Sequence, residues 1–315
     1  METLAVNGIG RIGKLVVKLL VQNQYNLTHL NEINGNTDSL MHSIEFDSIH
    51  GKWQANIEDG KDEIKIDGKS IKATFVENIK DLRLDDIDIM IDCTGVHKSS
   101  SKLQKYFDKG VKKVIVSAPI NEDNIVNIAY GVNHNIYKPK EHNIITGASC
   151  TTNCLAPVVK VVHENIGIKH GVYTTIHCVT NTQVVVDHPH KDMRRARSSL
   201  MNLIPTTTGS AKAIAMIYPE LEGKLNGHAV RIPLANASLT DCVFEVERPV
   251  TADEVNSLLC KAAKGDLAGI LGVEDRPLVS TDFVHDARSS IIDLSSTMVA
   301  DGSQVKILAW YDNEW

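Results

Sequence analysis

The sequence predicts an α/β protein of two domains, and three observations carry this prediction. Residues 1–148 alternate short apolar runs with helix-like segments, as in a parallel sheet with crossover helices. A G-x-G-x-x-G segment lies between the first expected strand and the first expected helix. After about residue 143, alternating strands are mixed with helices, which is typical of an α+β domain. We therefore expect a Rossmann-type, doubly wound domain over 1–148 and an α+β domain with a mostly antiparallel sheet over 149–315.

Individual elements follow from apolar periodicity and turn residues. In the first half, Ile64 and Ile66 alternate with polar residues before an Asp67-Gly68 turn, which predicts a hairpin within 57–75. The other expected strands are 3–6, 26–30, 87–94, 114–117, 172–180 and 240–248. The expected helices are 14–21, 98–109, 211–217 and 252–263.

Composition excludes several classes of protein. The chain has 315 residues, of which 43% are hydrophobic and 23% charged, so disorder is excluded as its main state. Its formal charge of -6 argues against a nucleic-acid or polybasic membrane partner. We find no apolar run long enough to cross a membrane and no secretory signal pattern. The six cysteines follow no disulfide spacing, so we expect reduced thiols and a cytoplasmic protein.

The glycine-rich turn has the features of a dinucleotide site. Gly8 would make the tight turn, Gly10 would let a pyrophosphate approach the backbone, and Gly13 would allow close helix packing. The pyrophosphate would rest on the helix N-terminus. Glu32 follows 19 residues after Gly13, where a carboxylate can bind a ribose 2′-hydroxyl and repel a 2′-phosphate. This favours NAD binding over a purely structural turn.

A second segment, Ser149 to Cys154, places a cysteine at the start of a helix. Ser149 is a plausible N-cap for a helix continuing toward Val162, and a helix N-terminus favours the thiolate form of Cys150. Pro157 would either kink this helix or mark its true first turn. Two alternatives stay open: a buried structural cysteine, and a C-x3-C metal half-site with Cys154. Spacing does not select a base among the 13 histidines.

Five segments in register resemble the glyceraldehyde-3-phosphate dehydrogenase family over the whole chain. They are NGIGRIG at 7–13, ASCTTNCLAP at 148–157, HKDMRRAR at 190–197, IPTTTG at 204–209 and WYDNEW at 310–315. The resemblance implies a coenzyme domain followed by a catalytic domain, and NAD as the cofactor. It implies that the Cys150 thiolate attacks the aldehyde carbon to give a thiohemiacetal, with His177 as the base in an ion pair with the thiol. Hydride transfer would then leave a thioester, which inorganic phosphate cleaves.

The resemblance also assigns binding positions. It implies coenzyme contacts, besides the three glycines, at Arg11, Ile12, Glu32, Thr94, Ser117 and Asn313. It implies contacts to the substrate phosphate or the attacking phosphate at Ser149, Thr151, Thr180, Arg195, Thr208, Gly209 and Arg231. Tyr311 and Pro189 fall at positions near the nicotinamide and the adenosine ribose. No metal is implied, and the expected partners are glyceraldehyde 3-phosphate, inorganic phosphate or arsenate, and further copies of this chain in a homotetramer.

Several positions depart from the family's usual pattern. Glu32 stands where Asp is common, and Ile33 replaces a usual Pro. Asn78 lies where a basic residue is often found near the adenine, and Thr182 where an Asp is common near the substrate phosphate. The family's C-terminal helix is not found after Trp315, and its loss would be expected to weaken NAD binding.

Further resemblance is to a narrower branch. The segments 45–53, 175–183 and 226–248 resemble dehydrogenases encoded beside arsenical efflux genes. Arsenate, nearly isosteric with phosphate, would give 1-arseno-3-phosphoglycerate in an arsenic detoxification pathway. Two other hypotheses are an erythrose-4-phosphate-type aldehyde dehydrogenase and a non-catalytic NAD-binding or redox-sensing protein of the same fold. The TTTG run at 206–209 favours inorganic phosphate as acceptor over the erythrose 4-phosphate alternative.

Overall fold

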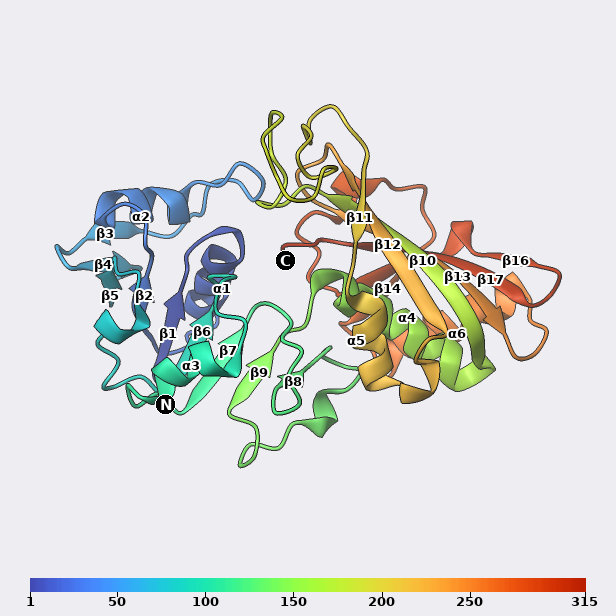
Figure 1. Ribbon diagram of the computed structural model, residues 1–315, viewed down its shortest axis with the longest axis horizontal. Coiled ribbons are helices and arrows are strands. Elements are labelled where there is room, and N and C mark those ends of the chain that lie inside the picture. Colours follow the sequence, from blue (N-terminus) through green and yellow to red (C-terminus); the bar gives the residue numbers. More distant parts are fainter. The chain divides into compact units, whose positions relative to one another are not determined.

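The computed structural model describes residues 1–315, which form two compact units (Figure 1). The first unit comprises Met1–Ile128 and Asn135–Ala148, and the second comprises Ala129–His134 and Ser149–Trp315. The segment Ala129–His134 belongs to the second unit, whereas a single boundary after residue 148 would assign it to the first. No helix in the chain is both long and apolar enough to cross a membrane.

A nine-stranded sheet forms the centre of the first unit, in the order β3-β4-β5-β2-β1-β6-β7-β9-β8. Its strands are β1 (Leu4–Asn7), β2 (Leu27–Asn31), β3 (Ile57–Asp59), β4 (Glu63–Ile66), β5 (Lys69–Thr74), β6 (Ile89–Asp92), β7 (Lys113–Val116), β8 (Val126–Asn127) and β9 (Ile144–Thr146). From β5 to β8 all neighbours are parallel, and β3, β4 and β5 pair antiparallel. The predicted hairpin is confirmed, because Asp67 and Gly68 take positive φ angles between β4 and β5.

Helices cover both faces of this sheet, as a doubly wound fold requires. The helices are α1 (Arg11–Gln22), α2 (Thr37–Glu45) and α3 (Ser100–Phe107). Leu4 and Val6 of β1 share a hydrophobic cluster with buried residues of α1 and α2, such as Val17. Ala5, between them, instead packs in a cluster with Leu103 and other residues of α3. Alternate residues of one strand thus serve two cores.

Chain order along the parallel strands reverses between β1 and β6. Strands β2 and β5 lie on one side of β1, and the chain then returns to place β6, β7 and β9 on the other. In open α/β sheets, ligands bind at the carboxyl ends of the strands where the order reverses. The predicted Rossmann-type domain is confirmed, and its reversal point lies at the ends of β1 and β6.

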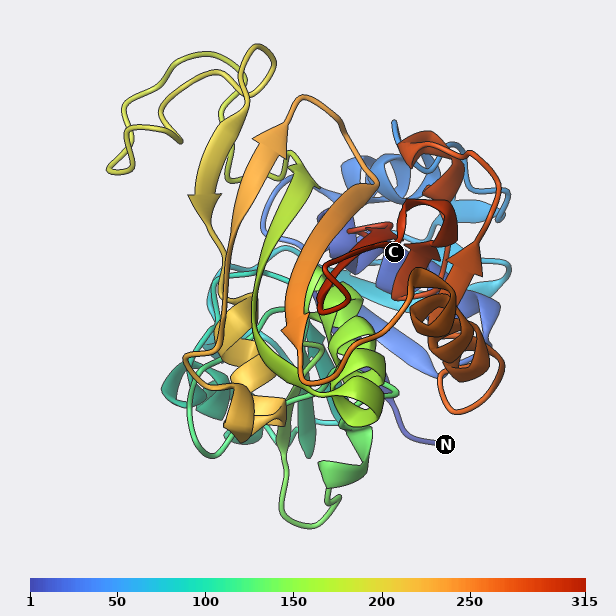
Figure 2. The ribbon, with the colours of Figure 1, turned by 90° about the vertical axis from the view of Figure 1, so that its right-hand side faces the viewer.

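The second unit contains an eight-stranded sheet, shown from one side in Figure 2. Its strands are β10 (Ile168–Cys178), β11 (Ile204–Thr207), β12 (Leu225–Ile232), β13 (Ser238–Val246), β14 (Leu271–Glu274), β15 (Ser290–Asp293), β16 (Met298–Ala300) and β17 (Gln304–Tyr311). Only β10 with β12 and β14 with β15 are parallel. The remaining pairs are antiparallel, so the prediction of a mostly antiparallel sheet is confirmed.

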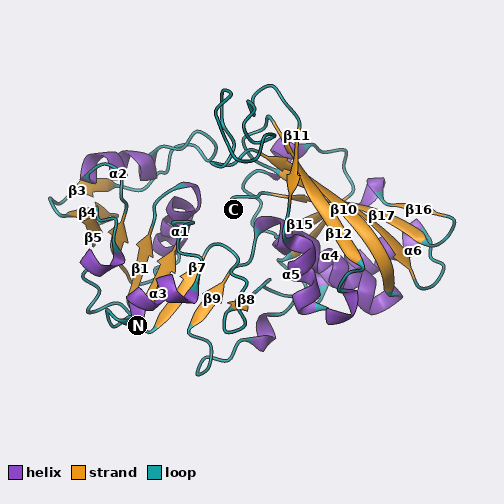
Figure 3. Ribbon diagram, viewed as in Figure 1, coloured by secondary structure: helices purple, strands orange, loops and turns teal.

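Three helices accompany this sheet: α4 (Cys150–Ile166), α5 (Ser210–Ile217) and α6 (Ala252–Lys264). Helix α4 buries Leu155, Val158 and Val162 in one core with Phe244 and Ile307 of the sheet. Helical residues continue through Pro157 and stop before Gly167, whose φ is 83°. Pro157 therefore lies within the helix, rather than in its first turn. A long segment between β10 and β11 has neither helix nor strand (Figure 3).

Candidate active site

In the first unit, the candidate coenzyme site begins at the glycine-rich turn between β1 and α1. Gly8 has a φ of +87°, and a Cβ there would lie 2.8 Å from the Cα of Thr94. A Cβ on Gly13 would overlap the carbonyl oxygen of Gly8. Gly10, by contrast, faces open space with no atom within 4 Å of its Cβ position. Two glycines are thus required by packing, and the third leaves room above the turn.

The N-terminus of α1 suits an anion. Gly10 is its N-cap, no side chain caps it, and its first turn holds no acidic residue. The first N–H groups of a helix have no intrahelical partners, and the helix dipole favours negative charge there. Together with the open space at Gly10 and the strand-order reversal, these features fit the pyrophosphate of NAD. Ile12 lies in this first turn, as the sequence analysis expects.

Glu32 directly follows β2 and reaches back to the turn. Its Oε2 accepts a hydrogen bond from the Ile9 N–H at 2.8 Å, and its Oε1 accepts one from the Asn34 N–H at 3.1 Å. These bonds fix the carboxylate beside the glycines while leaving lone pairs for a ribose hydroxyl. Arg11, also in the first turn, pairs with Asp47 through Nη1 at 2.6 Å.

Thr94 and Ser117 follow β6 and β7, the strands on the other side of β1. The hydroxyl and N–H of Thr94 both donate to Asp92 Oδ1, at 2.7 and 3.0 Å. The Ser117 N–H donates to the carbonyl oxygen of Asp92 at 3.0 Å. Both expected coenzyme residues therefore lie at the carboxyl ends of parallel strands, where ligands bind.

In the second unit, Cys150 is the first residue of α4. Ser149 caps the helix by accepting the Thr152 N–H with its hydroxyl, as its place in the sequence suggests. The preceding Ala148 has a φ of 56°, an uncommon conformation for a residue with a Cβ. Cys150 is a partly buried residue, and its Sγ lies 3.3 Å from Nε2 of His177. The structure thus brings together two residues that are 27 positions apart.

His177 and Arg231 face each other across two parallel strands. They are register partners of β10 and β12, so their side chains leave the sheet together. Nδ1 of His177 lies 2.7 Å from the carbonyl oxygen of Cys178, to which it can donate. Nη1 of Arg231 donates to the same oxygen at 2.8 Å and lies 2.5 Å from Nδ1. The two contacts of Nδ1 require different tautomers. Donation to the Cys178 carbonyl oxygen places the proton on Nδ1 and the lone pair on Nε2, which faces the thiol, whereas a hydrogen bond from Arg231 to Nδ1 places the proton on Nε2.

Burial and nearby groups act in opposite directions on the charges of the Cys150–His177 pair. Burial raises the pKa of the Cys150 thiol, although the Arg231 charge and hydrogen bonds at Thr151 oppose this effect. Burial, followed by the Arg231 charge, lowers the pKa of His177 to about 4. Desolvation therefore disfavours both charges of the pair, whereas the Arg231 charge and the hydrogen bonds at Thr151 favour the thiolate.

Tyr311 supports the pair from β17. Its ring meets the His177 ring edge-on, with centroids 6.0 Å apart. Its hydroxyl bonds the hydroxyls of Thr151 at 3.0 Å and Thr175 at 2.7 Å. Tyr311 is buried, and its ring packs against the His177 ring. Residue spacing in the sequence did not indicate this contact. Thr175 was missed because it is one of many threonines on an apolar strand.

Asn313 is held through a chain of two bonds. Its Oδ1 accepts from the Ser238 hydroxyl at 2.7 Å, and that hydroxyl accepts from the Cys178 N–H at 3.1 Å. Since Oδ1 faces Ser238, the Nδ2 donors face elsewhere, as a residue that binds a carboxamide oxygen requires. Ser238 belongs to no local motif, so the sequence did not indicate its role.

Candidate oxyanion groups form two sets. In the first, Nε of Arg231 is buried with no hydrogen-bond partner, and both the N–H and the hydroxyl of Thr180 donate to Gln183. In the second, Nε and Nη2 of Arg195 donate to Thr206 on β11 at 3.0 and 2.8 Å. Thr208 and Gly209 follow β11 at the uncapped start of α5, and a Cβ on Gly209 would meet open space.

Cys154 takes no part in a metal centre here. No group of three or more His, Cys, Asp or Glu side chains is placed to hold an ion. Cys154 is buried, lies 3.6 Å from the Ser290 hydroxyl and donates to the Ala309 carbonyl oxygen. Burial raises its pKa to about 12, so it stays a thiol. These contacts explain Cys154 as a core residue.

Comparisons with known proteins agree with this geometry. Residues 149–313 match the model of the glyceraldehyde 3-phosphate dehydrogenase C-terminal domain, and residues 2–100 match that of its NAD-binding domain. The chain belongs to the glyceraldehyde 3-phosphate dehydrogenase family. It is 54% identical to glyceraldehyde-3-phosphate dehydrogenase 3 of Nostoc sp., over 99% of this chain and 94% of the relative. It is 44% identical to glyceraldehyde-3-phosphate dehydrogenase 1 of Bacillus cereus, over 100% and 94%, and to glyceraldehyde-3-phosphate dehydrogenase 1 of Bacillus subtilis, over 99% and 93%.

This membership confirms three of the sequence predictions. The chain is an NAD-dependent glyceraldehyde-3-phosphate dehydrogenase, its cofactor is NAD, and its first unit is the NAD-binding domain. In the second unit, the thiol of Cys150 and the imidazole of His177 lie at hydrogen-bond distance, an arrangement that suits a cysteine nucleophile and its base.

Proposed function

We propose that this dehydrogenase oxidises glyceraldehyde 3-phosphate through a thioester on Cys150 and releases it with inorganic phosphate as 1,3-bisphosphoglycerate. The observation that carries this proposal is the 3.3 Å contact between Cys150 Sγ and His177 Nε2. A thiol paired with an imidazole is the arrangement that activates cysteine nucleophiles.

Cys150 acts first. As its sulfur bonds to the aldehyde carbon, the thiol proton moves to Nε2 of His177, which is neutral and able to accept it. The carbonyl oxygen becomes a hydroxyl when His177 returns that proton, which gives a thiohemiacetal. Tyr311 holds the imidazole ring in place during both transfers.

His177 then removes the hydroxyl proton as the carbon loses a hydride, and the carbon–oxygen double bond of a thioester forms. When bound, NAD supplies the hydride acceptor at its nicotinamide ring. Asn313, oriented by Ser238, has the free amide donors to fix the face of that ring. An oxygen of inorganic phosphate next bonds to the acyl carbon, and the carbon–sulfur bond breaks. The leaving sulfur takes the proton held by His177, which regenerates the Cys150 thiol and the neutral imidazole.

The two phosphate groups need separate donors. We assign the substrate phosphate to Arg231 and Thr180, because the buried Nε of Arg231 lacks a partner in the chain. We assign the attacking phosphate to Ser149, Thr151, Arg195, Thr208 and Gly209. Guanidinium forks, hydroxyls and backbone N–H groups are suited to phosphate oxygens.

Arsenate is proposed as a second acceptor, in keeping with the resemblance to dehydrogenases encoded beside arsenical efflux genes. It has the shape and charge of phosphate, so the same donors can hold it. We expect a kcat/KM with arsenate at least equal to that with phosphate. A strong preference for phosphate, or a gene neighbourhood without an efflux gene, would count against the detoxification role.

A homotetramer in the cytoplasm is also proposed. The segment between β10 and β11 exposes six large apolar side chains, a pattern typical of surfaces that are covered in an assembly. They are Val185, Val186, Met193, Leu200, Met201 and Leu203. All six cysteines are free thiols, which suits a reducing compartment. Light scattering should give four times the chain mass, and a monomer would contradict the proposal.

The test of the reaction is NADH formation at 340 nm from glyceraldehyde 3-phosphate, NAD and phosphate. The matched control is Cys154→Ser, since Cys154 lies on the same helix but in the core. We expect Cys150→Ser to be inactive and Cys154→Ser to keep most of the activity. Higher activity with erythrose 4-phosphate would favour the alternative aldehyde, and no activity in folded wild-type protein would favour a non-catalytic role.

A further inference from the structure

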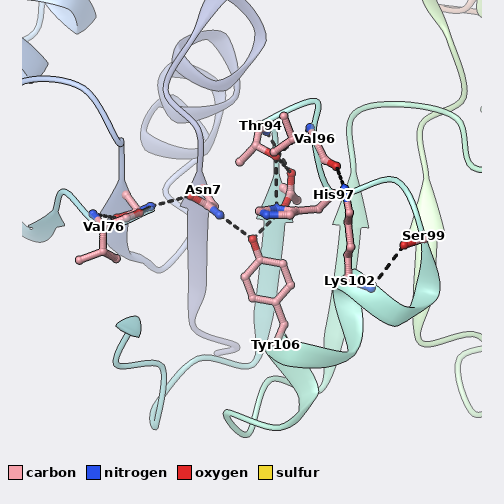
Figure 4. Close-up of polar contacts among 10 residues, drawn as sticks. Asn7, Val76, Thr94, Val96, His97, Ser99, Lys102 and Tyr106 are labelled. Carbon is pink, nitrogen blue, oxygen red and sulfur yellow. Dashed lines mark hydrogen bonds and ion pairs between the residues drawn. The ribbon is translucent and has the colours of Figure 1, made fainter. Parts of the chain in front are cut away.

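A buried network of polar side chains crosses the first unit beneath the coenzyme site (Figure 4). It starts at Asn31 on β2, passes through Asn7 on β1 and Tyr106 on α3, and reaches Asp92 on β6. His97, in the loop after β6, completes it with Nδ1 2.7 Å from Asp92 Oδ2. The network therefore joins the ends of three parallel strands, including the two where the strand order reverses.

The donors in this network all point one way. Asn31 Nδ2 donates to Asn7 Oδ1 at 2.7 Å, and Asn7 Nδ2 donates to the Tyr106 hydroxyl at 2.6 Å. The Tyr106 hydroxyl in turn donates its proton to Asp92 Oδ2 at 2.7 Å. Burial raises the pKa of Tyr106 far above its usual range, so the phenol keeps this proton. Asp92 is the acceptor at which the chain of donors ends.

Asp92 fixes the tautomer of His97. Its side chain is completely buried and accepts from the Tyr106 hydroxyl, from two donors of Thr94 and from His97. A carboxylate can only accept, so Nδ1 of His97 must carry a proton. In the neutral ring, Nε2 is then an acceptor, and no hydrogen bond within the chain uses it. The side chain retains 17% of its exposure and is therefore not sealed inside the unit.

The loop that carries His97 lies against the glycine-rich turn. The Cα and N of Thr94 would be 2.8 Å from a Cβ on Gly8, so the two backbones are in direct contact. Thr94 Oγ1 lies 3.3 Å from Nδ1 of His97. Lys102 of α3 holds the same loop by donating to the Val96 carbonyl oxygen at 3.0 Å. His97 is thus fixed beside the turn at which we place the pyrophosphate.

We propose that His97 is a coenzyme-positioning residue, whose Nε2 accepts a hydrogen bond from a hydroxyl or amino group on the adenosine half of NAD. Asp92 and the chain of donors behind it hold the ring in the one tautomer that can accept. We place the contact on the adenosine half because Glu32, which suits the adenosine ribose, and the loop of His97 flank the same glycine-rich turn. The proposal adds a contact to the NAD assignment and does not depend on the chemistry at Cys150.

Two substitutions separate the roles of the two ring nitrogens. Asparagine at this position places an amide donor near Nδ1 and can keep the bond to Asp92, but it has nothing at the Nε2 position. Glutamine is longer, and its carbonyl oxygen can reach the Nε2 position as an acceptor. Lys102→Met is the matched control, because it loosens the same loop without changing His97.

Calorimetric titration with ADP-ribose, which lacks the nicotinamide, measures the contact without turnover. We expect His97→Asn to raise the Kd roughly three- to tenfold, as for one lost hydrogen bond, with little change in Tm. His97→Gln should recover most of the affinity, and Lys102→Met should bind as wild type does. In assays of NADH formation, KM for NAD should rise in His97→Asn while kcat stays unchanged.

The donor to Nε2 could be the adenine amino group or a ribose hydroxyl. Nicotinamide hypoxanthine dinucleotide distinguishes them, because a carbonyl oxygen replaces the adenine amino group in this analogue. If the donor is the amino group, the difference between wild type and His97→Asn disappears with this analogue. If it is a ribose hydroxyl, the difference persists.

An unchanged Kd for ADP-ribose in His97→Asn would overturn the proposal. Equal losses in His97→Asn and His97→Gln, accompanied by a lower Tm, would also overturn it, since they would show a purely structural role. Wild-type protein that fails to bind both NAD and ADP-ribose would refute the cofactor assignment instead.

Discussion

The candidate anion sites of the two units are built from different chemical groups. In the first unit, the anion site is formed by backbone groups. Gly8 and Gly13 permit close packing, Gly10 leaves open space, and the uncapped N-terminus of α1 lies at that space. In the second unit, the candidate anion sites are formed by side chains. Arg231 lies beside His177, and Arg195 lies beside Thr206. A backbone site is encoded in a short segment, whereas a side-chain site is assembled from strands far apart in sequence. This difference decides which substitutions each site tolerates.

The largest effect is expected at the side-chain site. His177→Asn removes the base while keeping a polar side chain, so kcat should fall roughly 10³-fold, as for loss of a general base. NAD affinity should not change, because His177 is not among the expected coenzyme contacts. Steady-state kinetics and a separate NAD titration check both statements. A fall of less than tenfold would show that another group accepts the proton.

The backbone site is tested by a matched pair of glycine substitutions. Gly13→Ala places a methyl group on the Gly8 carbonyl oxygen and should cost about 2–3 kcal/mol of unfolding free energy. Gly10→Ala meets no atom of the chain, so it should cost less than about 1 kcal/mol. Its methyl group enters the space assigned to the pyrophosphate, and NAD affinity should fall about tenfold or more. Urea unfolding and NAD titration measure the two effects, and NAD affinity unchanged in Gly10→Ala would refute the placement.

The free energy of unfolding is expected to depend on pH because of His29, which lies outside both sites. Burial, followed by the charge of Lys72, lowers the pKa of His29 from its usual 6.5 to about 4. Between these values the unfolded chain binds the proton and the folded chain does not, so stability falls as the pH falls through this range. The loss should be roughly 2–3 kcal/mol, and His177, lowered similarly, adds to it.

His29→Gln should reduce this loss, since its amide can keep the bond to the Thr74 hydroxyl without titrating. Urea unfolding at pH 7 and pH 4.5 checks the prediction. An equal loss in the variant and in wild type would contradict it.

The smallest effect is expected at Tyr311. Tyr311→Phe keeps the ring against His177 but removes the hydroxyl shared by Thr151 and Thr175. Two buried hydroxyls lose a partner, which should cost about 1–2 kcal/mol. Unfolding free energy should fall by that amount while kcat changes less than threefold. A large fall in kcat would mean that the hydroxyl, and not the ring, positions His177.

The contrast between the units also explains what could be predicted from the sequence. The strand, the glycine-rich turn, the helix and Glu32 lie within one local stretch of the chain, so spacing alone identified them. Cys150 could be placed at a helix start from its Ser149 cap. His177 could not be selected from 13 histidines, because its function depends on β10 lying beside β12 and on the start of α4. Only the family resemblance supplied it.

Two features could be predicted neither from residue spacing nor from the family resemblance. The opposing effects of burial and of nearby hydrogen bonds and charges on the Cys150–His177 pair depend on the folded surroundings, which neither spacing nor resemblance reports. The Asn31–Asn7–Tyr106–Asp92–His97 network draws one residue from each of five segments of the chain. No periodicity links such residues, because the sheet order that brings them together is a property of the whole unit.

The most direct test of the thioester on Cys150 is a rapid-mixing measurement at 340 nm with enzyme, NAD and glyceraldehyde 3-phosphate, in the absence of phosphate. We predict a burst of about one NADH per active site that then stops, because the acyl group stays on sulfur. Addition of phosphate should start steady turnover, and Cys150→Ser should give no burst. Steady NADH formation without phosphate, or a full burst from Cys150→Ser, would contradict the account.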